Sequence, residues 1–294
     1  MSHKNYNSAV IGVDLGGTKV KAGLVAGGAI VSAASNLIPE SSEYDADAVV
    51  EVVKDTIAAV FSGEVSGIGI GIPSMLDREN GIIYDVQNIK SWKEIHLKDI
   101  LEAHFQVPVV MDNDANCFAM GEKLYGLGKN YENFAGITLG TGIGTGLINR
   151  GTLLADANCG SGEFGEIPYL DGKLEDYASG QFFKNNFKDD GPSIFVKAQR
   201  NDPAALQSYR QFGEHLGQAI KIIMYAVDPG NFILGGSIAE ARDYFDPAMR
   251  AAIETFTFPT SLKNLVIEYS RLGGDAPILG AAAVFHNCHW VKGR

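Results

Sequence analysis

A glycine-rich strand–turn–strand unit occurs twice in this chain, and this repeat constrains its fold more than any other feature. In the first copy, residues 9–14 (AVIGVD) have the pattern of a buried strand and run into the turn Leu15-Gly16-Gly17-Thr18-Lys19. In the second copy, the apolar residues 134–139 run into the glycine-rich segment 140–146. Residues 12–16 (GVDLG) align in register with residues 136–140 (GITLG). An internal duplication of this kind predicts two related lobes that face a cleft.

The rest of the chain alternates strand and helix patterns with short connections, which is typical of an α/β architecture. We expect further strands over residues 20–25, 29–33, 67–72, 107–111 and 231–234, and helices over 45–61, 97–105, 115–125, 203–227 and 278–285. The last helix is expected to pack back across the first lobe. The predicted smaller lobe spans residues 1–114, completed by a C-terminal helix at about 276–290, and the larger lobe spans residues 115–275.

Charge and composition argue against some classes of protein. The formal net charge is −11 and no segment concentrates Lys or Arg, so we expect neither nucleic acid nor a membrane as a partner. The polar N-terminus lacks a signal-peptide pattern, and no apolar run is long enough to cross a bilayer. Three cysteines at no ligand-like spacing are typical of buried thiols in a reducing cytosol. These features predict a cytoplasmic protein.

The two turns contain the residue types that bind phosphate. Glycine lets the backbone approach an anion closely, so that successive N–H groups converge on it, and threonine adds a hydroxyl donor. A single turn of this type can equally be a steric requirement of a tight hairpin. Two turns in register, one with Asp14 and the other with Thr138, favour a functional role. Neither turn is a P-loop, and residues 140–146 do not open a helix as a dinucleotide-binding motif does.

With these motifs the chain resembles the ROK family of sugar kinases and repressors, within the actin-like ATPase superfamily. The resemblance covers nearly the whole chain and rests on DLGGTK at 14–19, NDAN at 113–116, LGTGIG at 139–144, EFG at 163–165, DPG at 228–230 with Gly235-Gly236, and LGAA at 279–282. It implies a two-lobed ribonuclease-H-like fold with a duplicated core and an active-site cleft between the lobes. It also implies ATP with Mg²⁺, and a homodimer.

The same resemblance assigns the ATP site. Asp14 would hold Mg²⁺ through water, the two turns would bind phosphates, and Gly235-Gly236 would border the adenosine. The implied set is Asp14, Gly16, Gly17, Thr18, Lys19, Thr138, Gly140, Thr141, Gly142, Gly235 and Gly236. For Lys19, a surface lysine at the end of a strand is an equally good interpretation.

Asp114 is the candidate catalytic base. Phosphoryl transfer needs alignment, charge neutralisation and an acceptor for the hydroxyl proton, and a carboxylate at the end of a strand suits the last task. The alternative role is helix capping, because Asp114 or Asn113 precedes a predicted helix and both residue types are favoured N-caps.

The implied sugar-binding residues carry amides and carboxylates, which fix the directions of sugar hydroxyls. They are Asn88, Asn113, Asp114, Glu163, Glu166 and Glu175. The alternatives are a turn position for Asn88 and solvated loop positions for the glutamates. Trp92 could stack on a sugar, but a lone tryptophan is more often part of a core.

One departure from the family pattern removes its zinc site. Where the family has Glu-x-Gly-His followed by a cysteine cluster, this sequence has Glu166 at the histidine position and no cysteine over residues 167–174. Without thiolates no equivalent zinc site can be built. Glu163, Glu166 and Glu175 would then converge with Asp114, and closely spaced like charges raise at least one pKa and disfavour an anionic substrate. A neutral polyhydroxy substrate is therefore expected.

The predicted function is ATP-dependent phosphorylation of a neutral hexose, with glucose first. Because the sugar-contacting histidine is missing, an N-acetylhexosamine (N-acetylglucosamine or N-acetylmannosamine) kinase and a fructokinase are alternatives. A sugar-responsive regulator is an alternative from another class, but only about a dozen residues precede Asp14, too few for a helix-turn-helix unit. A non-catalytic sugar sensor is the third alternative. The presence of Asp14, Asp114 and both turns argues against it.

Overall fold

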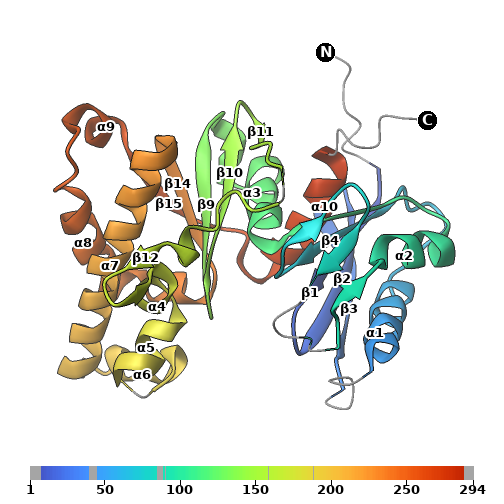
Figure 1. Ribbon diagram of the computed structural model, residues 1–294, viewed down its shortest axis with the longest axis horizontal. Helices are drawn as coiled ribbons and strands as arrows, with labels where there is room; N and C mark the ends of the chain where they lie inside the picture. The colour runs from blue at the N-terminus through green and yellow to red at the C-terminus, as the bar shows by residue number, and fades with distance from the viewer. Residues whose placement is uncertain are drawn as a thin grey trace. The chain divides into compact units, whose positions relative to one another are not determined.

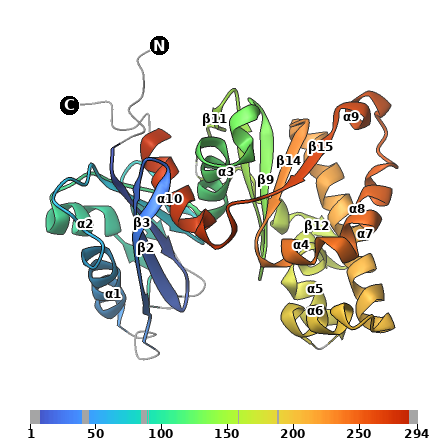
Figure 2. The same ribbon diagram turned by 180° about the vertical axis from the view of Figure 1, so that it is seen from behind.

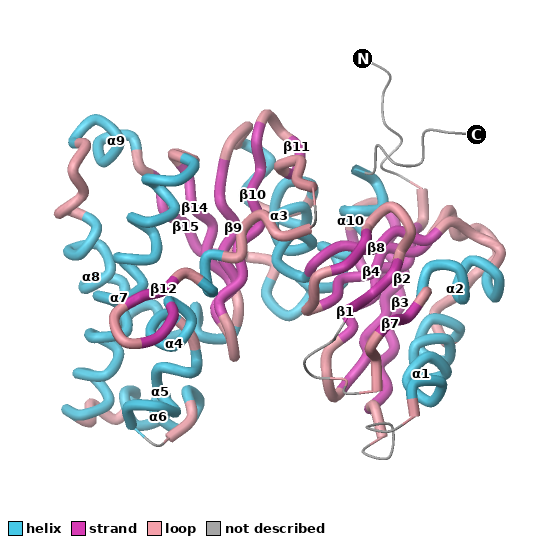
Figure 3. Tube along the Cα trace, viewed as in Figure 1, coloured by secondary structure: helices cyan, strands magenta, loops and turns pink. Residues whose placement is uncertain are grey.

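The computed structural model describes residues 8–39, 45–84, 89, 91–157, 159–187 and 189–287. Its internal contacts divide the chain into two compact units (Figures 1 and 2). The first unit comprises Met1–Glu132, Gly151–Ser161 and Leu272–Arg294, and the second comprises Asn133–Arg150 and Gly162–Arg271. In each unit, strands gather into a sheet with helices beside it (Figure 3).

The first unit is built on a five-stranded sheet in the order β3–β2–β1–β4–β8. Its strands are β1 (Val10–Leu15), β2 (Lys19–Ala26), β3 (Ala29–Leu37), β4 (Ile68–Ile72) and β8 (Val109–Asn113). β1 pairs antiparallel with β2 and parallel with β4, and β4 pairs parallel with β8. The carboxyl ends of β1, β4 and β8 therefore lie at one edge of the sheet. At this edge Asp14 and Asp112 are both in register with Gly71 on β4, which separates their Cα atoms by about 10 Å.

Two helices of the first unit, α1 (Ala46–Ala58) and α2 (Leu97–Phe105), pack with the sheet around one apolar core. Asp45 caps α1, because its Oδ1 accepts hydrogen bonds from the N–H groups of Asp47 and Ala48 at 3.0 and 3.2 Å. A small three-stranded sheet precedes α2. The remaining elements of this unit are β5 (Leu76–Asp77), β6 (Ile82–Tyr84), β7 (Glu94–Ile95), α3 (Asp114–Leu124), β11 (Thr152–Leu153), α10 (Ala276–Asn287) and 3₁₀ helices at Leu127–Asn130 and Gly273–Asp275.

Helix α10 lies directly against β1 and β4, and two glycines permit this contact. A Cβ atom built at Gly12 would lie 2.0 Å from the carbonyl oxygen of Ile278, and one built at Gly69 would lie 1.9 Å from that of Ala281. Both atoms would meet helix backbone rather than a movable side chain. Any larger residue at these positions would therefore push the helix away from the sheet.

Helix α3 packs against α10, so it belongs to the first unit. The sequence analysis placed residues 115–132 in the larger lobe, on the assumption that the boundary falls where β8 ends. The contacts with α10 place it after Glu132 instead, and they also assign Gly151–Ser161 to the first unit. The C-terminal helix belongs to the first unit as well.

The second unit repeats the sheet of the first. Strands β9 (Phe134–Leu139) and β10 (Ile143–Asn149) form an antiparallel hairpin, and β14 (Asn231–Gly235) pairs parallel with both β9 and β15 (Val266–Tyr269). The order β10–β9–β14–β15 thus matches β2–β1–β4–β8 strand for strand. In this match Thr138 takes the position of Asp14, since Thr138 is in register with Gly235 as Asp14 is with Gly71.

Helices make up most of the rest of the second unit. The 25-residue helix α7 packs along α8, where the rings of Phe212 and Phe245 meet edge to face at 5.4 Å. The other elements are 3₁₀ helices at Phe164–Glu166 and Ser237–Ala241, β12 (Pro168–Tyr169), β13 (Gly172–Lys173), α4 (Leu174–Ala178), α5 (Gly180–Phe187), α6 (Gly191–Gln199), α7 (Pro203–Val227), α8 (Arg242–Ile253) and α9 (Pro259–Asn264).

This duplicated strand order is that of the ribonuclease-H-like core found in actin-like ATPases. The predicted α/β fold class and the predicted internal duplication are therefore confirmed. Within the part of the chain that the structure describes, no helix combines the length and the apolar character needed to cross a membrane.

The contact of α10 with the sheet makes Gly12→Ala a strongly destabilising substitution. Overpacking typically costs 1–3 kcal/mol and occasionally more, and here the new methyl group meets backbone. We expect urea denaturation to show a loss of about 3 kcal/mol or more in the free energy of unfolding. Gly63→Ala is the matched control, because a Cβ atom at Gly63 has no neighbour within 4 Å. Equal stability of the two variants would contradict the close contact.

Candidate active site

The first glycine turn, residues 15–19, joins β1 to β2. The N–H of Gly16 donates to the carbonyl oxygen of Lys19 at 3.0 Å and closes the turn. Among the described residues no acceptor contacts the N–H groups of Gly17 and Thr18, and the residues Thr18 and Lys19 are exposed. The turn can therefore offer backbone donors to an anion.

Asp14 lies on β1 directly before this turn and has a cationic neighbour. The Nζ of Lys21, its register partner on β2, lies 3.5 Å from Asp14 Oδ2. Burial raises the pKa of the Asp14 carboxyl above its ordinary value, and Lys21 opposes that rise. The sequence analysis did not single out Lys21, although the register of a tight hairpin places residues 14 and 21 opposite each other.

The residues at the end of β8 lead directly into α3, and one of them caps the helix. Asn113 is the N-cap, because its Oδ1 accepts a hydrogen bond from the N–H of Ala115 at 2.9 Å. Asp114 is the first helical residue and is exposed. At this position the positive end of the helix dipole stabilises a carboxylate. Asn113 therefore takes the capping role considered for this motif, and Asp114 Oδ1 also accepts from the N–H of Ala115, at 2.8 Å.

Asp112, the residue before this pair, was missed by the sequence analysis. Its side chain is buried, and its Oδ1 accepts from the N–H of Asn113 and from Nδ2 of Asn116, both at 2.8 Å. Arg78 supplies the counter-charge, with its Nε 3.0 Å from Asp112 Oδ1. No local pattern could have revealed this pair, because 34 positions separate its members (112 − 78).

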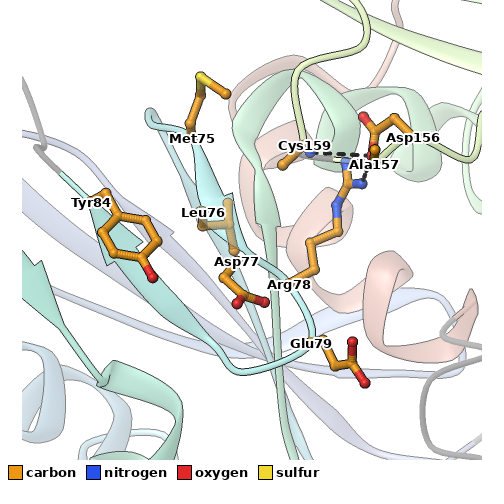
Figure 4. Close-up of a pocket in the computed structure, with 9 residues that line it drawn as sticks. All are labelled: Met75, Leu76, Asp77, Arg78, Glu79, Tyr84, Asp156, Ala157 and Cys159. Carbon is orange, nitrogen blue, oxygen red and sulfur yellow. Dashed lines mark hydrogen bonds and ion pairs between the residues drawn. The ribbon is translucent and has the colours of Figure 1, made fainter.

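A cavity of about 470 Å³ lies beside these residues in the first unit (Figure 4). Met75 and Tyr84 line one side, and Asp156 and Cys159 line the other, with Arg78 extended toward them. Its volume falls in the range of about 300–1,000 Å³ that is usual for small-molecule pockets. The first unit therefore has room for a small molecule near Asp112 on β8, which contacts the lining residues Arg78 and Cys159.

The second glycine turn, residues 139–143, joins β9 to β10 and is one residue shorter than the first, since Leu139 pairs with Ile143 where Leu15 pairs with Val20. The N–H of Gly140 donates to the carbonyl oxygen of Gly142 at 3.0 Å. Ser179 Oγ and the N–H of Gly180 donate to the carbonyl oxygens of Thr141 and Gly140, at 3.1 and 2.8 Å. In the described part of the chain, the N–H groups of Thr141 and Gly142 meet no acceptor. The turn's carbonyl groups are thus occupied, while amides remain for an anion.

Gly235 and Gly236 lie next to this second turn. Gly236 has a φ angle of +88°, and a Cβ atom there would lie 2.3 Å from the carbonyl oxygen of Leu139. Only glycine satisfies both conditions. Two of the segments assigned to ATP, the second turn and Gly235-Gly236, are therefore brought together in the second unit.

The three candidate glutamates gather around a lysine that the sequence analysis did not consider. Lys173 Nζ lies 2.6 Å from Glu166 Oε1 and 3.4 Å from Glu175 Oε1. Burial and then the charges of Glu166 and Glu175 raise the pKa of Glu163, whereas Lys173 lowers it. The expected pKa rise is thus present, and Lys173 reduces it. Glu175 Oε2 also accepts from the N–H of Ile143 at 3.3 Å, which links this cluster to the second turn.

Asn88, Trp92 and the possible metal ligands were the other candidates from the sequence. Asn88 lies outside the described residues. Trp92 is fully buried, and its indole N–H donates to the carbonyl oxygen of Ala46 at 3.1 Å, so it belongs to the core. Among the described residues there is no cluster of three or more His, Cys, Asp or Glu side chains able to hold a metal ion.

Magnesium brought by a nucleotide is compatible with Asp14. Mg²⁺ keeps several of its waters and is usually held by one or two carboxylates together with substrate phosphates. Asp14 supplies one carboxylate at the end of a strand, directly before amides suited to phosphate. A zinc ion is not compatible with the segment after Glu166, which contains no thiolate ligand.

The duplicated fold is that of the actin-like ATPases. Comparison with known proteins narrows the class, because a model of the ROK family matches residues 10–288. The chain belongs to the ROK family.

Its relatives include both kinases and regulators. The chain is 30% identical to a glucokinase of Thermotoga maritima, over 94% of this chain and 96% of that protein. It is 26% identical to the xylose repressor of Bacillus subtilis, over 93% of this chain and 76% of the repressor. A structure of a ROK family glucokinase from Streptomyces griseus in complex with glucose and AMPPNP superposes with a TM-score of 0.80, at 28% identity, and covers 94% of this chain and 98% of that chain.

The glutamate cluster generates a prediction about titration. Lys173→Met should raise the pKa of Glu163 further, because Lys173 is the cation that lowers it. A ¹³C NMR titration of the Glu163 carboxyl carbon measures this directly. Since the ion pair of Lys173 with Glu166 is largely exposed, its loss should change the free energy of unfolding by less than about 1 kcal/mol. Lys197→Met, which removes the partner of Asp189, is the control and should leave Glu163 unchanged. A Glu163 midpoint that stays in place in Lys173→Met would argue against the coupling.

Proposed function

We propose that this chain transfers the γ-phosphoryl group of MgATP to a hydroxyl of a neutral hexose, with glucose as the first candidate. Its class is that of a sugar kinase. The Thermotoga maritima relative is a glucokinase, and the Streptomyces griseus structure holds glucose together with an ATP analogue.

The duplicated turn is the observation that carries this proposal. Each unit has a strand–turn–strand element whose backbone amides are open to an anion, and only the first copy carries a carboxylate, Asp14, at the position held by Thr138 in the second. This asymmetry suits a nucleotide whose phosphates are bound by amides and whose magnesium needs one acidic residue. The proposed phosphate contacts are the two turns, and Gly235-Gly236 is the proposed border of the adenosine.

Asp114 acts as the general base in this proposal. As the sugar oxygen bonds to the γ-phosphorus, the bond from that phosphorus to the β–γ bridging oxygen breaks and ADP leaves. The proton of the sugar hydroxyl passes to the Asp114 carboxylate. Asn113 caps α3, and Asp114 directly after it is exposed, with its Oδ1 also accepting from the N–H of Ala115 at 2.8 Å. Magnesium, when bound with ATP, neutralises charge on the phosphates.

The proposed acceptor is neutral because four of the six candidate sugar residues are acidic. They are Asn88, Asn113, Asp114, Glu163, Glu166 and Glu175. In the second unit three of these carboxylates face one ammonium, that of Lys173. A sugar phosphate or sugar acid would add a like charge to this group. Hydroxyl groups, by contrast, can donate to carboxylates.

The same experiment tests two alternatives, a different acceptor sugar and a non-catalytic role. An N-acetylhexosamine or fructose acceptor changes the sugar but not the chemistry. A non-catalytic, sugar-responsive role is favoured by the similarity to the Bacillus subtilis xylose repressor. Sugar binding without turnover on any hexose would support that role.

Asp114→Asn separates these possibilities in an assay of ADP release with MgATP and a panel of neutral hexoses and N-acetylhexosamines. We expect turnover on at least one sugar by the unsubstituted chain and a fall in kcat of about 10²–10⁴-fold in the variant, the usual contribution of a general base. The KM for MgATP should change little, because the proposed contacts of MgATP do not include Asp114. Asp47→Asn is the control, since Asp47 is also an exposed acidic residue in the first turn of a helix. A variant at Asp114 that keeps full kcat would rule out its role as base.

The expected homodimer and cytoplasmic location belong to this proposal as well. A molar mass near twice that of the 31.5 kDa chain in light scattering, and recovery in the cytosolic fraction, are the results expected.

A further inference from the structure

Arg78 is a largely buried cation that joins three segments of the first unit. It directly follows β5, and only 17% of its side chain is exposed. Its Nε lies 3.0 Å from Asp112 Oδ1, an ion pair that lacks hydrogen-bond alignment. Its NH1 donates to Asp156 Oδ1 (Figure 4). One guanidinium thus connects the β5–β6 hairpin, the end of β8 and the segment around residue 156.

Asp112 transmits this contact to the start of α3. The same Oδ1 atom that faces Arg78 accepts from the N–H of Asn113 and from Asn116 Nδ2, both at 2.8 Å. These bonds fix the backbone at the N-cap of α3, and Asp114 is the next residue. Burial raises the pKa of Asp112, and the principal opposing influence is the charge of Arg78. Without Arg78, a buried carboxylate would lose its only close cation among the described residues.

Asp156 organises the second segment that Arg78 contacts. Its Oδ2 accepts from the N–H and the Oγ of Ser161 at 3.0 and 2.6 Å, and its Oδ1 accepts from the N–H of Cys159 at 3.3 Å. Cys159 Sγ in turn lies 3.7 Å from Asp112 Oδ1. Asp156, Cys159 and Ser161 are therefore held by the same charge network as the start of α3.

We propose that Arg78 is a positioning residue for phosphoryl transfer: by holding Asp112 and Asp156 it sets the orientation of Asn113 and Asp114 at the start of α3. It acts through Asp112 and not through contact with substrate. This inference rests on the proposed function, because it assigns Arg78 to the base of that reaction.

Charge-matched substitutions distinguish positioning from a general contribution to stability. Arg78→Met leaves the buried Asp112 carboxylate without its cation, so the bonds that fix the N-cap are disturbed. Asp112→Asn in the same chain removes the uncompensated charge, while the amide oxygen of the introduced side chain can still accept from Asn113 and Asn116. Arg78→Lys keeps the charge but offers a single ammonium where two carboxylates were held by a planar fork.

The measurement is kcat and KM, for sugar and for MgATP, on folded protein below the melting temperature of every variant. We expect Arg78→Met to lower kcat by about 10–100-fold, the scale of a misplaced catalytic group, with the KM for MgATP within about twofold of its original value. The kcat of Arg78→Lys should lie between those of the unsubstituted chain and Arg78→Met. The double variant, Arg78→Met with Asp112→Asn, should recover a large part of the lost kcat. Lys54→Met is the matched control, because Lys54 is similarly shielded (19% exposed) and pairs with Glu51 on α1.

The outcomes separate this inference from the function on which it rests. A lower melting temperature with unchanged kcat in Arg78→Met would overturn the positioning role and leave the kinase reaction standing. Failure of the double variant to exceed Arg78→Met in kcat would also contradict transmission through Asp112. If Arg78→Met does not fold, Arg78→Lys and the double variant make the same test. An unsubstituted chain that turns over no sugar would overturn the proposed function, and this inference with it.

Discussion

The contact between α10 and the sheet is the constraint on which the first unit depends. The helix backbone touches β1 at Gly12 and β4 at Gly69, with no room for a Cβ atom at either position. Helix α10 also packs against α3. Asp14 is the penultimate residue of β1 and Asp114 begins α3, so one helix supports both of the elements that carry these carboxylates. The register of β1, β4 and β8 then sets the separation of the two strand ends.

Duplication gives the chain two copies of one strand–turn–strand element, and the side chains around the two copies differ. In the turns after β1 and β9 the N–H of the first glycine donates to a carbonyl oxygen within the turn, that of Lys19 in one and of Gly142 in the other, and amides are left open to an anion. Their surroundings differ, because Asp14 is paired with Lys21, whereas Thr138 at the matching position carries no charge. In the second unit the acidic groups lie elsewhere, at Glu163 and its neighbours. The repeat accounts for the two turns with open amides, and the differences between the copies determine where the charged side chains lie.

Local patterns predicted most elements of the fold but not the partners of the site residues. The observed bounds of α2, β9 and α7 match the predicted ones, because apolar periodicity and flanking turn or cap residues are local signals. The cations Lys21, Arg78 and Lys173 went unrecognised. Strand register or tertiary contacts determine which acids they face. The boundary of the first unit was misplaced for the same reason, since the contact of α3 with α10 joins distant segments.

The transfer of a phosphoryl group from ATP to a sugar, as proposed for this chain, is tested most directly by ³¹P NMR. A time course with MgATP and one neutral hexose at a time would follow every phosphorus-containing species together. We expect, for at least one sugar, a new phosphate monoester resonance that grows in equal amount with ADP, without inorganic phosphate. ATP that stays unchanged with every sugar, or that yields ADP and inorganic phosphate without a sugar phosphate, would contradict it.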